Sequence, residues 1–169
     1  MDRNVPAVSA TVRHEVSCDP VAAWAFQAGL DPAEYYPSHG PLPAVVSVRD
    51  QSGDWRTSGH ERTLELSDGG SVIERLTDVS SPTFFAYDLR DFQKLFGALV
   101  SGARAEWSFE RTAEGTSIRW TYTFSPRPAR RWIVALIVRV AWKPYLVRVL
   151  ARIAADTEAA DTERSKRNA

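Results

Sequence analysis

Apolar and polar side chains alternate over residues 8–16, which is the two-residue period of a strand with one buried face. Helical signals follow this strand. Asp19 with Pro20 and Asp31 with Pro32 each place a capping side chain before a proline at the first helical position. The chain is therefore predicted to begin with one strand and two short helices.

The middle of the chain is predicted to form further strands at residues 44–48, 60–67, 72–79, 84–89, 105–111 and 117–124. Short turns rich in Gly, Ser, Asp and Pro separate most of them. Strands joined this tightly are antiparallel neighbours, because a parallel return needs a crossover of about a dozen residues. Residues 91–102 fit a helical face and a lid loop equally well, so their conformation stays open. The first strand can close the free edge of this meander.

Residues 129–155 are predicted to form one long C-terminal helix, which Pro144 should kink rather than end. Its most apolar run, residues 132–142, is too short to cross a bilayer, since that takes about 20 residues. The buried stripe of the helix is predicted to consist of Trp132, Ile133, Leu136, Ile137 and Val140. Residues 156–169 are polar and are predicted to be a flexible tail, which leaves residues 1–155 as a single domain.

Composition narrows the class of protein. The 169 residues suit one hydrophobic core, and six Trp, five Tyr and seven Phe argue against disorder. Lys and Arg together number 21, as do Asp and Glu, so no net charge favours nucleic acid and a small or apolar partner is expected. Cys18 is the only cysteine, which excludes an intrachain disulfide and suits a reducing cytoplasm. The polar N-terminal stretch does not resemble a secretion signal.

Motifs for metals and cofactors are not found in the sequence. His14, His39 and His60 are scattered, with no pair at helical spacing and no cysteine partner. Neither a glycine-rich phosphate loop nor a nucleophile elbow occurs. We therefore expect no metal site and no cofactor.

Strand parity predicts which side chains point toward the helix. On the last two predicted strands the inward face is aromatic, and it is the natural side to bury. It is made up of Trp107, Phe109, Ile118, Trp120, Tyr122 and Phe124. Large aromatic side chains of this kind form the core of a domain more often than they contact a ligand.

The hairpin between residues 60–67 and 72–79 carries the polar exceptions. If its loop is Asp68-Gly69-Gly70, the facing pairs are Leu66 with Val72, Leu64 with Glu74, and Arg62 with Leu76. All of these side chains then share one face, whereas a two-residue turn would move Glu74 to the other face. A carboxylate on an apolar face needs a partner, and Arg62 lies on the diagonal of the same face.

Three passages resemble a known superfamily. They are GHERTL at residues 59–64 with DGG at 68–70, VIERL at 72–76 with AY at 86–87, and WSF at 107–109 with GTSIRW at 115–120. Together with the order of elements over residues 8–155, they resemble the SRPBCC or START-like helix-grip superfamily. That superfamily includes polyketide cyclases and dehydratases, START lipid-transfer domains, birch-pollen-allergen (Bet v 1-like) proteins and plant hormone receptors.

The resemblance implies an α+β fold with a curved seven-stranded antiparallel sheet and helices at fixed places along the chain. Two short helices come after the first strand, and the long C-terminal helix lies over the concave face. It also implies an apolar cavity between sheet and helix, with Tyr87 and Leu89 facing inward. Members of the polyketide-cyclase-like branch commonly bind apolar molecules or lipids and only sometimes catalyse. They share no catalytic motif that could be transferred to this chain.

A set of candidate ligand contacts follows from the predicted faces. It comprises Arg62, Leu64, Leu66, Glu74, Tyr87, Trp107, Phe109, Trp120, Tyr122, Trp132, Leu136 and Arg139. Arg62 and Glu74 could orient a polar group of the ligand, with Tyr87 or Tyr122 as hydroxyl donor; the alternatives are a structural ion pair or a solvated sheet face. Arg139 and Lys143 could line the mouth of a pocket, or they could cover apolar surface with their stems.

Three functions fit these features. The first is binding of a small hydrophobic or aromatic molecule, a lipid or a polyketide-like compound. The second is a cyclase or dehydratase in which Glu74 or Tyr87 moves a proton. The third is a membrane-surface or protein-interaction module that uses residues 132–152 as a basic amphipathic helix, which exposure of residues 132–142 would favour. The chain could act as a monomer or as a homodimer.

Overall fold

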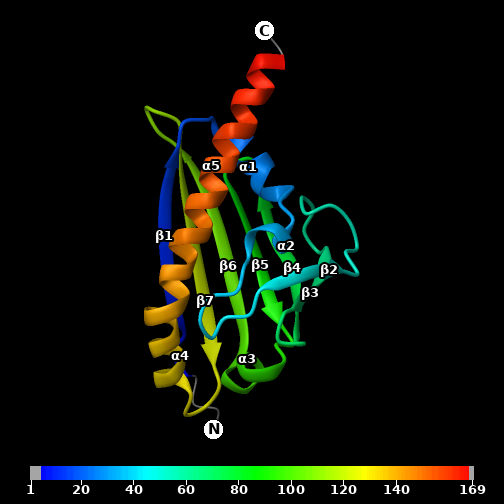
Figure 1. Ribbon diagram of the computed structural model, residues 1–169, viewed down its shortest axis with the longest axis vertical. Coiled ribbons are helices and arrows are strands. Elements are labelled where there is room, and N and C mark those ends of the chain that lie inside the picture. Colours follow the sequence, from blue (N-terminus) through cyan, green and yellow to red (C-terminus); the bar gives the residue numbers. More distant parts are fainter. Residues whose placement is uncertain (1–4, 168–169) are drawn as a thin grey trace.

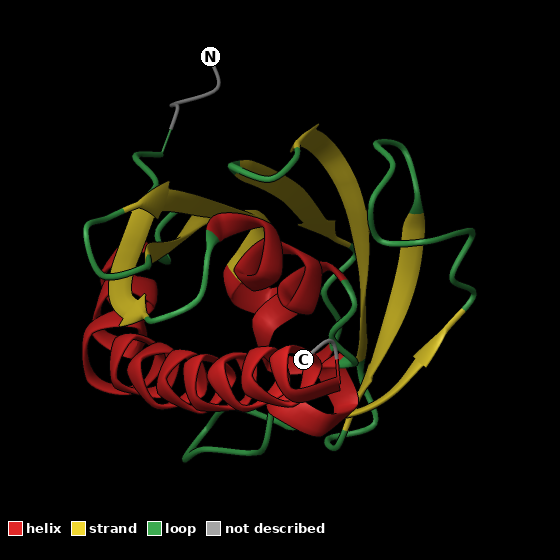
Figure 2. Cartoon of the chain, turned by 90° about the horizontal axis from the view of Figure 1, so that it is seen from above, coloured by secondary structure: helices red, strands yellow, loops and turns green. Residues whose placement is uncertain are grey.

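The computed structural model describes residues 5–167, in which seven antiparallel strands form one curved sheet around a long C-terminal helix (Figures 1 and 2). The strands are β1 (Val8–Val16), β2 (Val45–Arg49), β3 (Glu61–Leu66), β4 (Ser71–Ser80), β5 (Phe84–Arg90), β6 (Val100–Arg111) and β7 (Thr116–Pro126). The helical elements are α1 (Pro20–Ala28), α2 (Pro32–Tyr35), α3 (Lys94–Leu99), α4 (Arg131–Ile137), the π-helical turn η1 (Val138–Trp142) and α5 (Lys143–Arg167). This is the expected helix-grip order, so the predicted fold class is confirmed.

The caps predicted from sequence start both short helices. The Asp19 side chain accepts a hydrogen bond from the Ala22 N–H at 2.9 Å, and Asp31 accepts one from Ala33 at 3.0 Å. The sheet order is β1-β7-β6-β5-β4-β3-β2, so β1 closes the edge beside β7 as predicted. The stretch that the sequence left open, residues 91–102, contains α3 and the first residues of β6.

The β3–β4 hairpin keeps the predicted faces but has a different register. Arg62 lies opposite Glu74, and Leu64 lies opposite Val72, two positions from the predicted pairing. The turn begins one residue earlier than expected, because Gly69 takes the left-handed conformation, at φ 76°, and the Leu66 N–H donates to the Gly70 carbonyl. A shift by two residues preserves parity, so these side chains still share the concave face.

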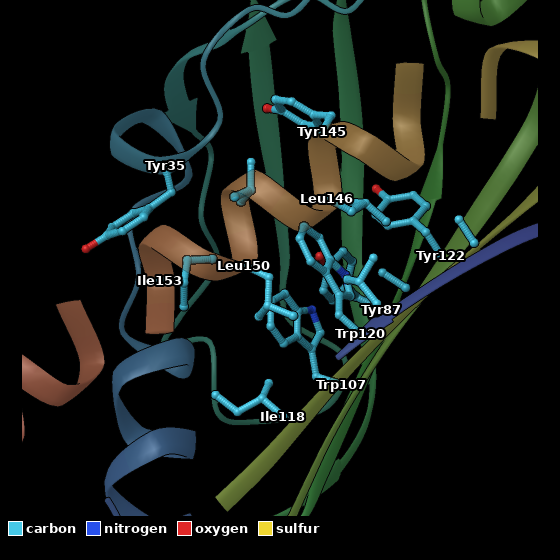
Figure 3. Packing of buried hydrophobic residues seen from close by; sticks show 14 of the residues in the cluster. Tyr35, Tyr87, Trp107, Ile118, Trp120, Tyr122, Tyr145, Leu146, Leu150 and Ile153 are labelled. Atoms are coloured by element: carbon cyan, nitrogen blue, oxygen red, sulfur yellow. The ribbon is translucent and has the colours of Figure 1, made fainter. Parts of the chain in front are cut away.

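The core forms where the concave face meets α5. Figure 3 shows Trp107, Ile118 and Trp120 of the sheet facing Leu150 and Ile153 of the helix. Trp107 and Trp120 stack with ring centroids 4.3 Å apart, and both are completely buried. The predicted inward faces of β6 and β7 are therefore confirmed.

The predicted buried stripe of the C-terminal helix is partly wrong: Ile133 and Ile137 are half-buried against the core as expected, but the other three residues are not. Trp132, Leu136 and Val140 are exposed, whereas Val134 and Val138 are buried against the rest of the fold. Residues 132–142 are apolar on nearly every side, so their periodicity could not identify the inward face. The chain continues in helical form through Pro144, which follows the π-helical turn by two residues and cannot donate to a carbonyl in the preceding turn.

The predicted tail after residue 155 is also helical. α5 runs to Arg167, and only residues 168–169 of the expected tail lie outside the described residues. Thr157 is 2% exposed, the Tyr35 hydroxyl donates to Asp156 at 2.9 Å, and the Ser17 N–H donates to Glu158 at 2.7 Å. These tertiary contacts hold a polar sequence in place. Within residues 5–167, no helix is both long enough and apolar enough to cross a membrane.

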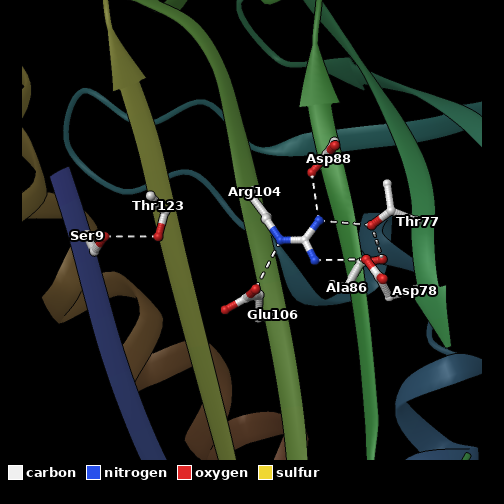
Figure 4. A network of polar contacts seen from close by, with 8 residues as sticks. All are labelled: Ser9, Thr77, Asp78, Ala86, Asp88, Arg104, Glu106 and Thr123. Atoms are coloured by element: carbon white, nitrogen blue, oxygen red, sulfur yellow. Dashed lines mark hydrogen bonds and ion pairs between the residues drawn. The ribbon is translucent and has the colours of Figure 1, made fainter. Parts of the chain in front are cut away.

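On the convex face of the sheet, polar side chains connect neighbouring strands (Figure 4). Arg104 of β6 donates to Asp78 at 2.8 Å, to Asp88 at 3.1 Å and to Glu106 at 2.9 Å. The hydrogen bond from Arg104 is the main cause that lowers the pKa of Asp78. This network ties β4, β5 and β6 together on the face that the helix does not cover.

Candidate functional site

A cavity lies between the concave face of the sheet and the segment that joins η1 to α5. The accessible volume of the cavity is about 80 Å³. One water molecule needs only about 10–15 Å³ on the same measure. Its walls are formed by Tyr36, Leu42, Pro43, Val45, Leu64, Leu66, Val72, Glu74, Tyr87, Leu89, Phe92, Phe96, Tyr122, Phe124, Trp142 and Tyr145. Nearly all of these side chains are aliphatic or aromatic, which suits an apolar guest.

Trp142 forms the helical wall of the cavity. Its ring meets those of Tyr122 and Phe124 edge to face, with centroids 4.9 Å and 5.3 Å apart. Tyr145 packs against the same indole at 5.6 Å, and Phe96 of α3 approaches it at 6.5 Å. The wall is therefore a continuous aromatic surface shared by sheet, helix and α3.

Glu74 brings a carboxylate into this apolar space. Arg62 Nε donates to Glu74 Oε2 at 2.7 Å, and the two side chains are only 7% and 5% exposed. The Arg62 guanidinium lies behind the carboxylate and stacks over the Trp55 ring, 3.8 Å from its centroid. Arg62 thus compensates the buried charge, while Glu74 itself lines the cavity.

Three tyrosine hydroxyls accompany this carboxylate. Burial is the main cause that raises the pKa of Tyr36, Tyr87 and Tyr122 well above the ordinary value, and the negative charge of Glu74 raises each of them further. These residues therefore stay neutral and can donate hydrogen bonds at any physiological pH.

Several polar groups of the cavity wall are free to bind a guest. Within residues 5–167, neither the Tyr36 nor the Tyr122 hydroxyl has a side-chain hydrogen-bond partner among the contacts found for the described chain. The indole N–H of Trp142 also lacks a partner there, but it is enclosed by the surrounding side chains.

The structure brings together part of the predicted ligand set. Leu64, Leu66, Glu74, Tyr87 and Tyr122 all lie on the cavity wall. Trp107, Phe109 and Trp120 are buried in the core outside that wall, and Arg62 sits behind Glu74. Trp132, Leu136 and Arg139 are exposed and do not border the cavity, because their side of the helix faces away from the sheet.

Other wall residues were not identified from the sequence. Tyr36 and Leu42 come from the connection between α2 and β2, which has no periodic pattern. Phe92 and Phe96 fall in the stretch whose conformation stayed open. Trp142 and Tyr145 belong to the long helix, but the side of it that faces the cavity was not the predicted one. An aromatic residue in each of these segments was the only available signal.

Metal-binding geometry is not present in the described part of the chain. Among residues 5–167, no group of three His, Cys, Asp or Glu side chains is arranged to hold a metal ion. Cys18 is buried, and burial is the main cause that raises its pKa to about 11. Its thiol is therefore protonated and a poor nucleophile at neutral pH.

Comparison with known families gives a match that spans nearly the whole chain. The model of the family described as "Polyketide cyclase / dehydrase and lipid transport" matches residues 7–158. No curated protein matches the sequence. The candidate cavity lies within the matched residues.

Solved structures share the fold at low sequence identity. The chain aligns with Ara h 8.0201 at a TM-score of 0.60 and 13% identity, covering 91% of this chain and 99% of that one. A protein from Bacillus thuringiensis aligns at 0.60 and 17% identity, covering 89% and 98%. The di-domain ARO/CYC StfQ from the steffimycin biosynthetic pathway aligns at 0.67 and 15% identity, covering 92% of this chain and 52% of that one.

Proposed function

The chain belongs to the polyketide cyclase / dehydrase and lipid transport family, and from this premise we propose that it binds a small, largely apolar molecule in the cavity beneath η1 and α5. The observation that carries the proposal is the make-up of the cavity wall. Aliphatic and aromatic side chains surround one carboxylate and a few hydroxyl donors. Pockets that bind small molecules typically combine such an apolar lining with a few convergent polar groups.

The polar groups of the wall suggest what the ligand carries. Glu74 can accept a hydrogen bond, whereas Tyr36 and Tyr122 can donate one. A ligand with both a hydroxyl and a carbonyl would satisfy the two kinds of group. Hydroxylated aromatic polyketide-like compounds have this pattern, and lipids with a single polar head share part of it.

Catalysis is the second candidate function. A carboxylate beside a tyrosine in an apolar cavity could move a proton next to a carbonyl, with Glu74 and Tyr87 as the reacting groups. Glu74 Oε2 already accepts a charge-assisted hydrogen bond from Arg62, which makes that oxygen less free to take a proton from a substrate. We therefore place binding ahead of cyclase or dehydratase activity.

The proposal also covers where the protein acts and what it binds. A single cysteine allows no intrachain disulfide, which suits a reducing compartment, so we propose that the protein acts in the cytoplasm. We propose a small hydrophobic ligand as its partner, without nucleic acid, since the sequence carries no net charge.

Ligand binding can be tested by thermal shift and native mass spectrometry against hydroxylated polycyclic aromatics and single-chain lipids. Tyr122→Phe removes one donor and leaves the ring packing intact. We expect about a tenfold loss of affinity for a ligand that accepts from this hydroxyl. Glu74→Gln should weaken a ligand that donates to the carboxylate, and Glu110→Gln, on the exposed part of β6, is the matched control.

Two outcomes would contradict the proposal. In one, no compound shifts the melting temperature or co-purifies with the protein. In the other, Tyr122→Phe and Glu74→Gln bind every ligand as Glu110→Gln does. Turnover of a bound polyketide that Glu74→Gln abolishes would instead favour the enzyme.

A further inference from the structure

The outward face of α4 and η1 is apolar although nothing in the fold covers it. Trp132, Leu136 and Val140 follow one another at four-residue steps, and they are 69%, 53% and 59% exposed. Val147 continues the same side of the molecule on α5. The opposite side of the helix already supplies the packing against the sheet. An exposed tryptophan within a row of aliphatic side chains is typical of a binding surface.

The segment that carries this face is rich in cations and contains no acidic residue. Residues 126–155 contain Arg127, Arg130, Arg131, Arg139, Lys143, Arg148 and Arg152, and neither Asp nor Glu. All of these cations are exposed, and within residues 5–167 none forms an ion pair with a carboxylate. The whole chain has no net charge, so the positive charge of this segment is a local feature.

Two of the cations lie within the apolar row itself. Arg139 and Lys143 are four residues apart and alternate with Leu136, Val140 and Val147 along the exposed side. Arg148 and Arg152 are engaged elsewhere, with His39 and with the Tyr35 ring. The row therefore combines a tryptophan, aliphatic side chains and free positive charges.

This face lies at the same end of the molecule as α3, which forms part of the cavity wall (Figure 1). Arg127 Nε donates to the Gly97 carbonyl at 2.7 Å and thereby ties the approach to α4 to α3. Leu95 of α3 is 52% exposed, while Phe92 and Phe96 of the same segment line the cavity. A surface that covered α4 would thus lie near the α3 wall of the cavity.

We propose that the outward face of α4 and η1 docks on an anionic phospholipid bilayer. Tryptophan prefers the headgroup level of a bilayer, aliphatic side chains enter the acyl boundary, and Arg and Lys attract anionic headgroups. A second copy of the chain fits less well. In a symmetric pair the same cations would meet across the interface with no acidic residue to balance them.

Binding to vesicles tests this surface, and variants of its exposed residues leave the cavity wall unchanged, so failure of this proposal can be told apart from failure of the proposed function. Purified protein is floated with phosphatidylcholine vesicles and with vesicles that also contain phosphatidylserine, at low and at moderate salt. We expect binding to the anionic vesicles, a loss of binding as salt rises, and a blue shift of tryptophan emission.

The variants separate the two contributions. Trp132→Ser with Leu136→Ser should abolish the emission shift and most of the binding. Arg139→Gln with Lys143→Gln should weaken binding to anionic vesicles by roughly tenfold or more, since each cation near the surface contributes about a fivefold increase. All four side chains are exposed, so circular dichroism and melting temperature should stay unchanged.

Matched controls come from the sheet. Arg13→Gln with Arg119→Gln removes two exposed cations that lie side by side on β1 and β7, and Val46→Ser removes an exposed apolar side chain on β2. Both should bind as the unaltered chain does. The proposal is overturned if the protein ignores anionic vesicles, if the controls weaken binding equally, or if sedimentation shows a dimer that Trp132→Ser dissociates.

Discussion

Glu74 is the residue on which the chemistry of the cavity depends. Its carboxylate is almost wholly removed from water, and Arg62 supplies its only hydrogen bond among the described residues. Burying two charges costs several kcal/mol per ion, and this cost is offset only while both partners are present. The pair is therefore a means of keeping a carboxylate in an apolar cavity, and its contribution to stability depends on both halves.

Breaking this pair from one side should destabilise the protein more than removing it. Arg62→Met leaves the Glu74 charge buried and should lower the free energy of unfolding by about 3–5 kcal/mol. Arg62→Met with Glu74→Leu should recover most of that loss. Urea denaturation measures both. Arg104→Met, in the half-exposed network of Figure 4, is the comparison and should cost about 1 kcal/mol or less.

Two results of these stability measurements would contradict the role of Arg62. If Arg62→Met costs no more than Arg104→Met, or if the double variant is less stable than the single one, the carboxylate is not held by Arg62. The ion pair would then be incidental to the site.

Among the elements, the C-terminal helix has more roles than its sequence pattern predicts. It supplies the core with Leu146 and Leu150, and the cavity with Trp142 and Tyr145. Its last turns are anchored by polar contacts to α2 and to the end of β1. One helix therefore closes the core, walls the cavity and presents an apolar face to solvent.

Removing the end of this helix should reveal where its anchoring stops. Truncation after Ala155 deletes buried Thr157 and the partners of Tyr35 and Ser17. We expect a loss of about 2–4 kcal/mol and a fall of roughly 5–15 °C in Tm, measured by differential scanning calorimetry.

Truncation after Thr162 is the matched control. Within the described residues it removes only the exposed residues 163–167, and it should leave Tm unchanged within about 2 °C. Equal effects of the two truncations would show that the contacts of Asp156 and Glu158 do not hold the helix.

For the whole molecule, the tyrosines report how completely the fold excludes water. Burial is the main cause that raises the pKa of all five, to about 12 for Tyr35 and further for the others. In the unfolded chain they should ionise near the ordinary value of about 10. A pKa raised in the folded state adds stability below pH 10, and this stability is lost as pH rises through the folded values.

Alkaline titration tests this property of the whole fold. Near pH 10 the native protein should show no tyrosinate absorbance, while the same chain in denaturant titrates fully. At higher pH, ionisation and loss of circular dichroism should occur in one transition. A tyrosine that ionises near pH 10 with the circular dichroism unchanged would contradict the burial of at least one of these rings.

The sequence by itself determined the features that depend on near neighbours. Alternating residues specified the strands, aspartate followed by proline specified two helix starts, and parity placed Trp120 and Tyr122 on the inner face. Parity also joined Arg62 and Glu74 on one face, even though the register was two residues off. These features follow from periods of two or four residues, which are visible in any short window.

The tertiary structure decided the features that depend on contacts between residues far apart in the sequence. Residues 132–142 are apolar on almost every side, so only packing against the sheet could choose Val134 and Val138 over Trp132 and Leu136. Residues 156–167 are polar, and their helix is held by the Tyr35 hydroxyl and the Ser17 N–H, both more than a hundred positions away in the chain. The cavity wall likewise joins segments with no shared local pattern. Burial depends on which residues the folded chain brings close together, and the local pattern of apolar residues does not contain that information.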